Sequence, residues 1–434
     1  MRTIKRFIGP GNITYYGSKK EILVPLEYQE KNKELRGVWF STVANIDIPV
    51  TKSAEECKAY LLGVIKTVKE HNMNAVVFQA RPTNDAFYKS ELNPWSSFIT
   101  GTQGQEPGFD LLAFFIEEAK KENISVHAWL NPYRISHRKL SDLKMDKLTF
   151  LNTLATNNFA RLNPDLVIET TETKLILDPA SPKVIEFMAE TVKELAMNYD
   201  IKSIHIDDYF YPYEPINDPE ETVKHQASGI EKLSDFRREN VNKLIKKIHE
   251  TLKALPKKVE FGISPFAVYR INSKLFEETR QNDEAAWEHG LDCHPSSFSC
   301  YKSLYADIYL WMKKGWIDYI VPQDYFAMDN RSMKDGIPGH ETAKYCDIAK
   351  WWSNLAKETK TKLYMGQGLY LCKEEGIWSN PLEINNQMLY NQNYDNIVGT
   401  VFFTYKNLKE DNNRALIETR NNLKKFWTKP AKEI

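Results

Sequence analysis

Two adjacent aspartates, Asp207 and Asp208, end an apolar segment of the sequence, SIHIDDYFYP at 203–212. Two neighbouring carboxylates are costly to bury, and each raises the pKa of the other, so that one of them can hold a proton near neutral pH. A protonated carboxyl beside an ionised one is suited to general acid catalysis. We therefore take both as candidate catalytic residues. The simpler alternative is that one of them caps a turn or pairs with an arginine.

This chemistry is what the cleavage of a glycosidic bond requires. One group must protonate the leaving oxygen, while an anion or a nucleophile meets the positive charge that develops at the anomeric carbon. A further candidate carboxylate is Asp324, in the segment PQDYF at 322–326, and Asp85 is the alternative to it. The sequence leaves open which of these two supplies the second carboxylate.

Polar and aromatic residues also close other β-rich segments, namely QARPTNDAFY (79–88), HAWLNPYR (127–134), GISPF (262–266) and PQDYF. A single arginine, aspartate or histidine in such a place is more often structural than functional. Polar clusters at five strand ends, however, are hard to explain as packing, and they indicate one binding site. The predicted substrate-binding residues are Trp39, Arg81, Asp85, His127, Asn131, Tyr133, Arg134, His205, Tyr209, Gln323 and Tyr325.

The elements that position these residues follow a regular alternation. Short β-rich segments are separated by longer amphipathic ones, which predicts repeated βα units. The expected strands are 36–43, 74–81, 124–130, 201–207, 258–264, 318–323, 362–368 and 397–403. Eight such units predict an α/β protein of the (β/α)₈ or TIM-barrel type, and a chain of 434 residues is within its range when the loops are long. Residues 1–35 are expected to form an N-terminal arm packed on the barrel, and residues 36–434 the catalytic barrel.

Local signals place the expected helices. Ser53 is a predicted N-cap with Glu56 at the capping-box position, Asp110 and Pro182 mark two further starts, and the other helices are expected near 233–255, 303–314, 341–359 and 382–392. The connections that follow the second to the sixth expected strand are long, whereas those from each helix back to the next strand are short. Barrel enzymes carry their active sites on the face formed by the connections that follow the strands. We expect these residues near one rim: Trp39, Arg81, Asn131, Asp207, Ser264, Gln323 and Gln367. A doubly wound open sheet is the main rival, but neither GxGxxG nor GxxxxGK occurs.

Composition favours an uncharged partner. Lys and Arg together number 58, as do Asp and Glu, so no net field attracts nucleic acid or anionic lipid. The 10 Trp and 22 Tyr suit packing against sugar rings, although a large aromatic core explains them equally well. The five cysteines are scattered, and no second ligand pair accompanies the group of Cys293, His294 and Cys300. We therefore predict an oligosaccharide or polysaccharide substrate, no nucleic acid, no metal and no cofactor.

The N-terminal segment contains basic residues but no apolar run of the length that a secretory signal needs. No other segment approaches the roughly 18 apolar residues of a membrane span. The sequence as it stands predicts a cytoplasmic protein without a membrane span. An extracellular or cell-envelope location is the alternative if an export signal has been removed.

Several of these segments carry a family resemblance. RGVWFSTVANIDIP, FQARPTNDAFYKSELNPWSSFITGTQGQEPGFDLL, VHAWLNPYR, LDPASPKV, IHIDDYFYP, FGISPF and DYIVPQDYF, in this order, resemble the bacterial glycosyl-hydrolase-like family numbered ten, once described as a domain of unknown function. The resemblance covers about residues 35–405. It implies a TIM barrel and, through a divisome-associated member, cleavage of peptide-free peptidoglycan glycan.

The resemblance also implies roles for individual positions. The positions that match the family's paired aspartates are Asp207 and Asp208, and the matching rim residues are Arg81, Asp85, His127, Asn131, Arg134 and Gln323. Two features depart from the family pattern. Family members usually carry an export signal or a lipoprotein anchor, and many have an apolar residue where this chain has Asp324.

Together these observations predict a glycoside hydrolase that cleaves β-linked, N-acetylhexosamine-containing glycans, with Asp207 and Asp208 at the centre of the mechanism. A catalytically silent carbohydrate-binding barrel is the contrasting hypothesis, because a fold hosts many functions. A polysaccharide deacetylase would need an Asp-His-His metal triad, and no His-x-x-x-His pair stands beside a strand-end aspartate.

Overall fold

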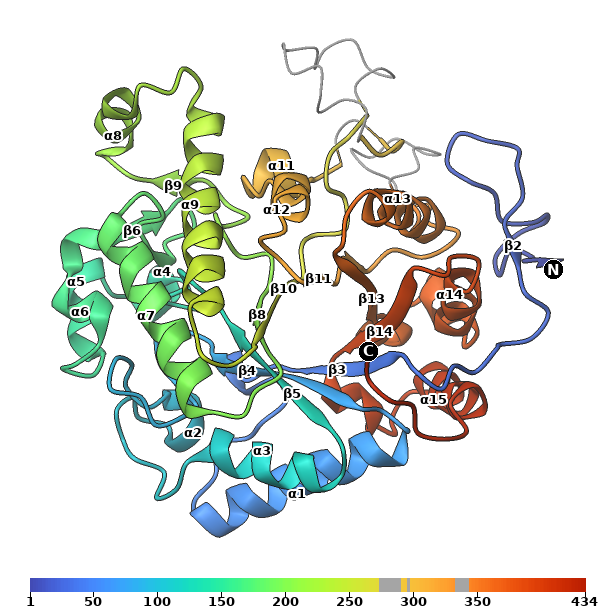
Figure 1. The fold of residues 1–434 in the computed structure, drawn as a ribbon, viewed down its shortest axis with the longest axis horizontal. Helices are drawn as coiled ribbons and strands as arrows, with labels where there is room; N and C mark the ends of the chain where they lie inside the picture. Colours follow the sequence, from blue (N-terminus) through green and yellow to red (C-terminus); the bar gives the residue numbers. More distant parts are fainter. Residues whose placement is uncertain (273–289, 295–296, 332–342) are drawn as a thin grey trace.

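The computed structural model describes residues 1–272, 290–294, 297–331 and 343–434. Its centre is a closed barrel of eight parallel strands surrounded by helices, which confirms the predicted (β/α)₈ fold (Figure 1). The barrel strands are β3 (Leu35–Phe40), β4 (Ala75–Arg81), β5 (Ser125–Leu130), β8 (Ser203–Ile206), β10 (Glu260–Ile263), β11 (Tyr319–Ile320) with β12 (Gln323–Asp324), β13 (Lys362–Gly368) and β14 (Ile397–Phe403).

The sixth barrel strand is divided into β11 and β12 at Val321 and Pro322. Proline has no backbone N–H, so it cannot donate to a neighbouring strand. Its carbonyl still accepts from the Gly366 amide at 2.9 Å, and the Val321 amide donates to Ile263 at 2.8 Å. β11 and β12 therefore together form one barrel strand between β10 and β13.

Most helices begin close to the predicted positions, but the one expected near 303–314 is divided into α11 (Cys300–Ser303) and α12 (Ile308–Lys313). Ser53 caps α1, and its hydroxyl accepts from the Glu56 amide at 3.1 Å. The Glu56 carboxylate accepts from the Lys52 amide at 2.8 Å, one residue before the expected one. The predicted start near Glu341 lies outside the described residues. The helices that alternate with the barrel strands are α1 (Ala54–Glu70), α3 (Leu111–Lys121), α7 (Pro182–Asn198), α9 (Leu233–Lys253), α12 (Ile308–Lys313), α13 (Tyr345–Lys357), α14 (Glu383–Asn391) and α15 (Arg414–Phe426).

The connections at the carboxyl ends of the strands contain the remaining short elements. They are η1 (Val43–Asn45), α2 (Ser97–Thr100), α4 (Leu140–Leu143), α5 (Lys147–Thr153), α6 (Phe159–Leu162), η2 (Pro164–Leu166), β6 (Val167–Thr170), β7 (Leu175–Leu177), β9 (Ile216–Asn217), α8 (Glu221–Ser228), α11 (Cys300–Ser303), η5 (Leu369–Lys373), η6 (Gly376–Ser379) and η7 (Tyr405–Leu408). β7, β6 and β9 form an antiparallel sheet that ties the connection after β5 to the one after β8. This sheet fixes two of the long connections above the barrel.

The barrel interior has its own core, separate from the apolar layer between strands and helices. It consists of Leu35, Trp39, Ala75, Val77, Trp129, Tyr319, Val321, Tyr364 and Val401. Large aromatic rings fill a barrel interior only where a neighbouring strand offers a small residue. Gly262 lies opposite Tyr319 in the ladder, and a Cβ at Gly262 would lie 1.9 Å from the Tyr319 ring. The interior is therefore a packed core rather than a channel.

Both ends of the chain contact the barrel assembly. β1 (Arg2–Thr3) pairs with β2 (Leu23–Val24), and the Tyr15 hydroxyl lies 3.0 Å from that of Tyr390 on α14. At the other end, Glu433 approaches His127 Nε2 at 3.3 Å, near the amino ends of the strands. In the described part of the chain, no helix has the length and apolar character to cross a membrane.

Candidate functional site

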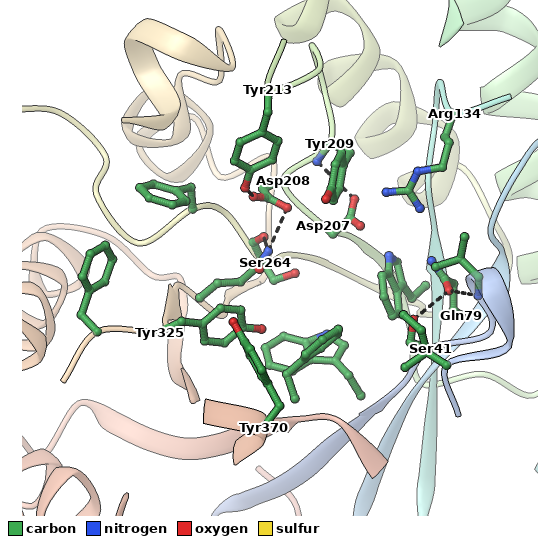
Figure 2. Close-up of a pocket in the computed structure, with 18 residues that line it drawn as sticks. Ser41, Gln79, Arg134, Asp207, Asp208, Tyr209, Tyr213, Ser264, Tyr325 and Tyr370 are labelled. Atoms are coloured by element: carbon green, nitrogen blue, oxygen red, sulfur yellow. Dashed lines mark hydrogen bonds between the residues drawn. The ribbon is translucent and has the colours of Figure 1, made fainter. Parts of the chain in front are cut away.

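A pocket of about 410 Å³ lies over the carboxyl ends of the barrel strands (Figure 2). This is the face at which barrel enzymes carry their active sites. The lining residues are Trp39, Ser41, Val43, Ile46, Gln79, Trp129, Arg134, Asp207, Asp208, Tyr209, Tyr213, Ser264, Phe266, Gln323, Tyr325, Phe326, Tyr370 and Phe403. Asp207 and Asp208, which directly follow β8, both face it.

Asp207 is almost fully buried in the wall of this pocket. Its carboxylate accepts a hydrogen bond of 2.6 Å from Asn131 Nδ2 and one of 3.3 Å from the Tyr209 amide. Burial raises the pKa of Asp207 to about 7, the Arg134 guanidinium opposes that rise, and the neighbouring Asp208 adds to it. Asp207 is thus close to half-protonated at neutral pH, as a general acid requires.

Asp208 has a different set of partners. It accepts hydrogen bonds from the Tyr213 hydroxyl and, at 3.0 Å, from Gln323 Nε2. Burial raises the pKa of Asp208, and these two donors act in the opposite direction. Asp208 raises the pKa of Asp207, so the two buried carboxylates do not ionise independently. The pair therefore provides one acid and one anion in the same pocket.

Two polar side chains, those of Gln79 and Arg134, fix the orientation of Asn131, the donor to Asp207. Asn131 Oδ1 accepts from Gln79 Nε2 at 2.6 Å and from Arg134 Nη1 at 3.0 Å. Gln79 is itself held, because its side-chain oxygen accepts from the Val43 amide at 2.8 Å. The amide nitrogen of Asn131 is consequently directed at Asp207. The Arg134 guanidinium also lies 4.3 Å from the centre of the Tyr209 ring.

Aromatic side chains line much of the pocket. Trp39 and Phe403 meet edge to face at 6.1 Å, as do Tyr325 and Tyr370 at 5.8 Å. Trp129 lines the same cavity from β5. Flat apolar faces with polar edges suit a ligand that has both C–H and hydroxyl surfaces, such as a sugar ring.

Below the pocket, buried hydrogen bonds run into the barrel interior. His205 lies 2.9 Å from the Ser264 hydroxyl through Nε2 and 3.0 Å from the Tyr319 hydroxyl through Nδ1. Tyr319 continues to Ser203 at 2.8 Å, and Ser203 to His127 at 2.7 Å. Burial holds the pKa of His205 well below its usual value, so it is neutral. These histidines support Ser264 from beneath and do not line the pocket.

The sequence-predicted residues therefore separate into two groups. Those that line the pocket are Trp39, Arg134, Asp207, Asp208, Tyr209, Gln323 and Tyr325. Those that do not line it are Arg81, Asp85, His127, Asn131, Tyr133, His205 and Asp324. Two further residues were expected at the rim, and of these Ser264 lines the pocket whereas Gln367 does not. The side chain of Gln367 donates to Gln387 on α14, at 2.9 Å, and so faces outward.

Arg81 and Asp85 organise the loop that follows β4. Arg81 donates to the Asn131 carbonyl at 2.7 Å and to Asn93 at 3.0 Å. Asp85 accepts from Gln103 at 3.2 Å. Arg81 and Asp85 are both fully buried. Each holds the loop structure through these bonds. Asp85 therefore does not line the pocket and is not placed to act as a second catalytic carboxylate.

Asp324 also lies away from the pocket, contrary to the expectation for it. It is fully buried, and its side chain is near Tyr345, Cys346 and Asp347 on α13. Burial raises the pKa of Asp324 well above its usual value. Neighbouring strand residues point to opposite sides of a sheet, so while Gln323 faces the pocket Asp324 faces the helix layer. The prediction of Asp324 as a catalytic residue placed it on the wrong side of its strand.

Several pocket residues were not identified from the sequence. They are Ser41, Val43, Ile46, Gln79, Trp129, Tyr213, Phe266, Phe326, Tyr370 and Phe403. Strand alternation places Gln79 on the same strand face as Val77, and Trp129 on the same strand face as His127. It was therefore a usable signal for Gln79 and Trp129. Tyr213 and Tyr370 lie in loops, where no periodicity reports direction.

No group of three or more His, Cys, Asp or Glu side chains in the described ranges is arranged to hold a metal ion. Cys293 and Cys300 are both buried, and the Cys300 thiol points at the Tyr269 carbonyl, 3.6 Å away. Burial raises the pKa of Cys300 well above its usual value, which disfavours the thiolate that binds zinc.

Comparison with known proteins gives a family and a fold. The profile of the family described as glycosyl hydrolase-like 10 matches residues 34–380. Glycosyl hydrolase YngK of Bacillus subtilis (strain 168) is 36% identical over 390 residues, covering 88% of this chain and 70% of that protein. Glycosyl hydrolase DigH of Escherichia coli (strain K12) is 30% identical over 403 residues, covering 87% and 84%.

Two solved structures resemble the fold at low sequence identity. One is the PgaB (BpsB) glycoside hydrolase domain from Bordetella bronchiseptica, with a TM-score of 0.52, 11% identity and coverage of 91% of this chain and 98% of that one. The other is the catalytic domain of β-amylase from Paenibacillus polymyxa, with a TM-score of 0.51, 8% identity and coverage of 90% and 98%. Both likenesses concern the barrel fold alone.

Proposed function

The chain belongs to the glycosyl hydrolase-like 10 family, which supports glycosidase activity, and we propose that it hydrolyses β-linked glycans containing N-acetylhexosamine, such as peptidoglycan strands. The relatives YngK and DigH are both named glycosyl hydrolases. The finer assignment of the substrate rests on the arrangement of the pocket's carboxylates.

The observation that carries this proposal is the adjacency of Asp207 and Asp208. Among the described residues that line the pocket, they are the only carboxylates. A glycosidase that uses its own nucleophile or base places a second carboxylate across the bond, at roughly 5–9.5 Å from the acid. Outside this adjacent pair, no described lining residue provides a carboxylate. A substrate that brings its own nucleophile, the oxygen of a 2-acetamido group, removes the need for it.

The two aspartates then have separate roles. Asp207 gives its proton to the glycosidic oxygen as the bond from that oxygen to the anomeric carbon breaks. The acetamide oxygen forms the new bond to the anomeric carbon, and ionised Asp208 accepts the acetamide N–H and stabilises its positive charge. Water then attacks the same carbon and gives its proton to Asp207, which restores the acid and the acetamide.

The test of this function is a matched panel of glycans. We expect release of shorter fragments from peptide-stripped peptidoglycan or from chitin oligomers, detected by mass spectrometry. Cellulose oligomers are the control, because they have the same β-1,4 linkage and a hydroxyl in place of the acetamide. They should not be cleaved. Equal cleavage of both classes would exclude participation of the acetamide and favour a mechanism with a protein nucleophile.

One protonated and one ionised carboxyl in the same pocket predict a bell-shaped dependence of kcat/KM on pH. Activity requires protonated Asp207, whose pKa in the free protein is raised to about 7, so kcat/KM should fall about tenfold per pH unit above that value. At lower pH it should fall again as Asp208 is protonated. Tyr213→Phe removes a donor that favours ionised Asp208. It should move the acidic limb to higher pH and leave the alkaline limb in place, and a shift of the alkaline limb alone would contradict these assignments.

A further inference from the structure

A second pocket adjoins the one that contains the aspartates. Its volume is about 230 Å³, and it shares Val43, Arg134 and Tyr209 with the first pocket. The residues that line it are Val43, Ala44, Tyr133, Arg134, Ser136, His137, Lys174, Ile176, Tyr209, Phe210, Pro212 and Glu214. The two cavities thus lie on either side of a wall formed by Arg134 and Tyr209.

This wall is built from one fixed and one accessible side chain. Arg134 is anchored to Asn131 at 3.0 Å, and its guanidinium covers one face of the Tyr209 ring. Tyr209 is 41% exposed, whereas Asp207 beside it is 4% exposed. Figure 2 shows Arg134 extending toward Tyr209 at the edge of the first pocket. A chain-like ligand held at Asp207 can therefore pass over Tyr209 into the second pocket.

Three charged side chains line the second pocket, namely Arg134, Lys174 and Glu214, and the Arg134 guanidinium interacts with the charges of Asp207 and Asp208 in the first pocket. The Lys174 ammonium lies 3.4 Å from Glu214 and 3.3 Å from Glu172. Burial and the nearby Arg134 and Arg138 lower the pKa of His137, which is therefore neutral at pH 7. The pocket offers hydrogen-bond donors and acceptors without an excess of one charge. This chemistry suits hydroxyl groups better than a phosphate or a carboxylate.

The remaining lining and the volume limit what can fit. Ile176, Phe210 and Pro212 supply apolar surface beside the polar groups. The volume is below the roughly 300–1,000 Å³ typical of sites for drug-sized ligands, so the pocket suits one ring rather than a chain. We propose that this second pocket is a subsite for one further, uncharged sugar unit of the glycan that is bound at Asp207 and Asp208.

This inference rests on the proposed function, because it assigns the pocket to the same glycan. A ligand that spans both pockets gains contacts that a short fragment lacks. Affinity should therefore rise with glycan length until the subsite is filled. One additional well-placed unit worth about 1.4 kcal/mol raises affinity tenfold.

Ala44→Trp is designed to fill the subsite without touching the first pocket. Ala44 is exposed and lines only the second pocket. Its φ of 53° is a left-handed conformation that a bulky residue adopts less readily than alanine, so unchanged thermal melting of the Ala44→Trp protein is a required control. The control is Val50→Trp, because Val50 is 48% exposed on the same connection and lines neither pocket. Both changes add the same ring to the same loop.

Binding is measured by calorimetric titration with the chitin disaccharide and hexasaccharide, in protein carrying Asp207→Asn so that turnover does not interfere. We expect about tenfold tighter binding of the hexasaccharide in this parent and in the Val50→Trp protein. In the Ala44→Trp protein the hexasaccharide should bind no better than the disaccharide, whose affinity should not change.

Two results would overturn the subsite. One is the absence of length dependence in the parent, and the other is an unchanged hexasaccharide affinity in the Ala44→Trp protein. Because binding is measured without turnover, the two proposals fail separately. Length-dependent binding with no cleavage of any glycan by the natural sequence would retain the subsite and reject the hydrolase. Cleavage without length-dependent binding would retain the hydrolase and reject the subsite.

Discussion

Asp207→Asn should lower kcat on a cleaved glycan by about 10²- to 10⁴-fold, the contribution that a general acid typically makes. Asparagine keeps the shape of the side chain and can still accept from Asn131 Nδ2, but it has no proton to give to the leaving oxygen. Binding of the substrate should persist, because the pocket keeps its other lining residues. The measurement is kcat and substrate affinity for the natural sequence and the variant, with unchanged thermal melting as the control for folding.

Asp208→Asn is the matched comparison. It removes the anion held by Tyr213 and Gln323, and we expect it to reduce kcat by a smaller factor than Asp207→Asn. Undiminished turnover in both variants would exclude the pair from the mechanism. If the natural sequence binds glycans but cleaves none, the chain is a carbohydrate-binding barrel. Affinity would then depend on aromatic residues of the pocket such as Trp39 and Trp129.

The strands could be located from the sequence because their signal is local. Each is a short β-rich segment followed by a longer amphipathic one, and the eight expected ranges overlap the observed barrel strands. The carboxyl ends of parallel barrel strands meet on one face, so the position of Asp207 and Asp208 at a strand end was sufficient to place both beside the same pocket. No long-range information was needed for this part of the site.

The direction of a side chain was harder to predict, because it depends on details of the backbone. Asp324 differs from Gln323 by one position, yet it faces α13 while Gln323 faces the pocket. The break at Pro322 removes the long alternating pattern from which a face could be assigned. Arg81 closes a strand as Asp207 does, but the loop that follows supplies it with buried partners. Which partners a loop supplies depends on tertiary contacts, which sequence spacing does not reveal.

The interior glycines show a similar limit. The sequence of β10 contains Gly262, which would ordinarily weaken a strand. The structure supplies the reason for it, because the Tyr319 ring occupies the space of the missing side chain. The Tyr319 hydroxyl then reaches Ser203 at 2.8 Å and His205 at 3.0 Å, and His205 supports Ser264 at the base of the pocket.

Gly262→Ala should accordingly be among the most destabilising single methyl additions in the chain. The new Cβ would lie 1.9 Å from the ring of Tyr319, which the packed interior prevents from moving freely. Overpacking and the loss of the buried hydrogen bonds of Tyr319 together should cost on the order of 2–5 kcal/mol. The measurement is the shift in the midpoint of urea denaturation.

Gly63→Ala provides the opposite control, because Gly63 lies inside α1 and a Cβ there meets no atom within 4 Å. It should stabilise the protein by about 0.5–1 kcal/mol, since alanine loses less conformational freedom in a helix. Adding Tyr319→Leu to Gly262→Ala shortens the clashing side chain, so the double variant should be less destabilised than the sum of the two single changes. Additive losses, or a Gly262→Ala protein as stable as the natural sequence, would show that the ring does not determine the choice of glycine. A sub-additive loss would locate the strain at this contact and account for a glycine in the middle of a barrel strand.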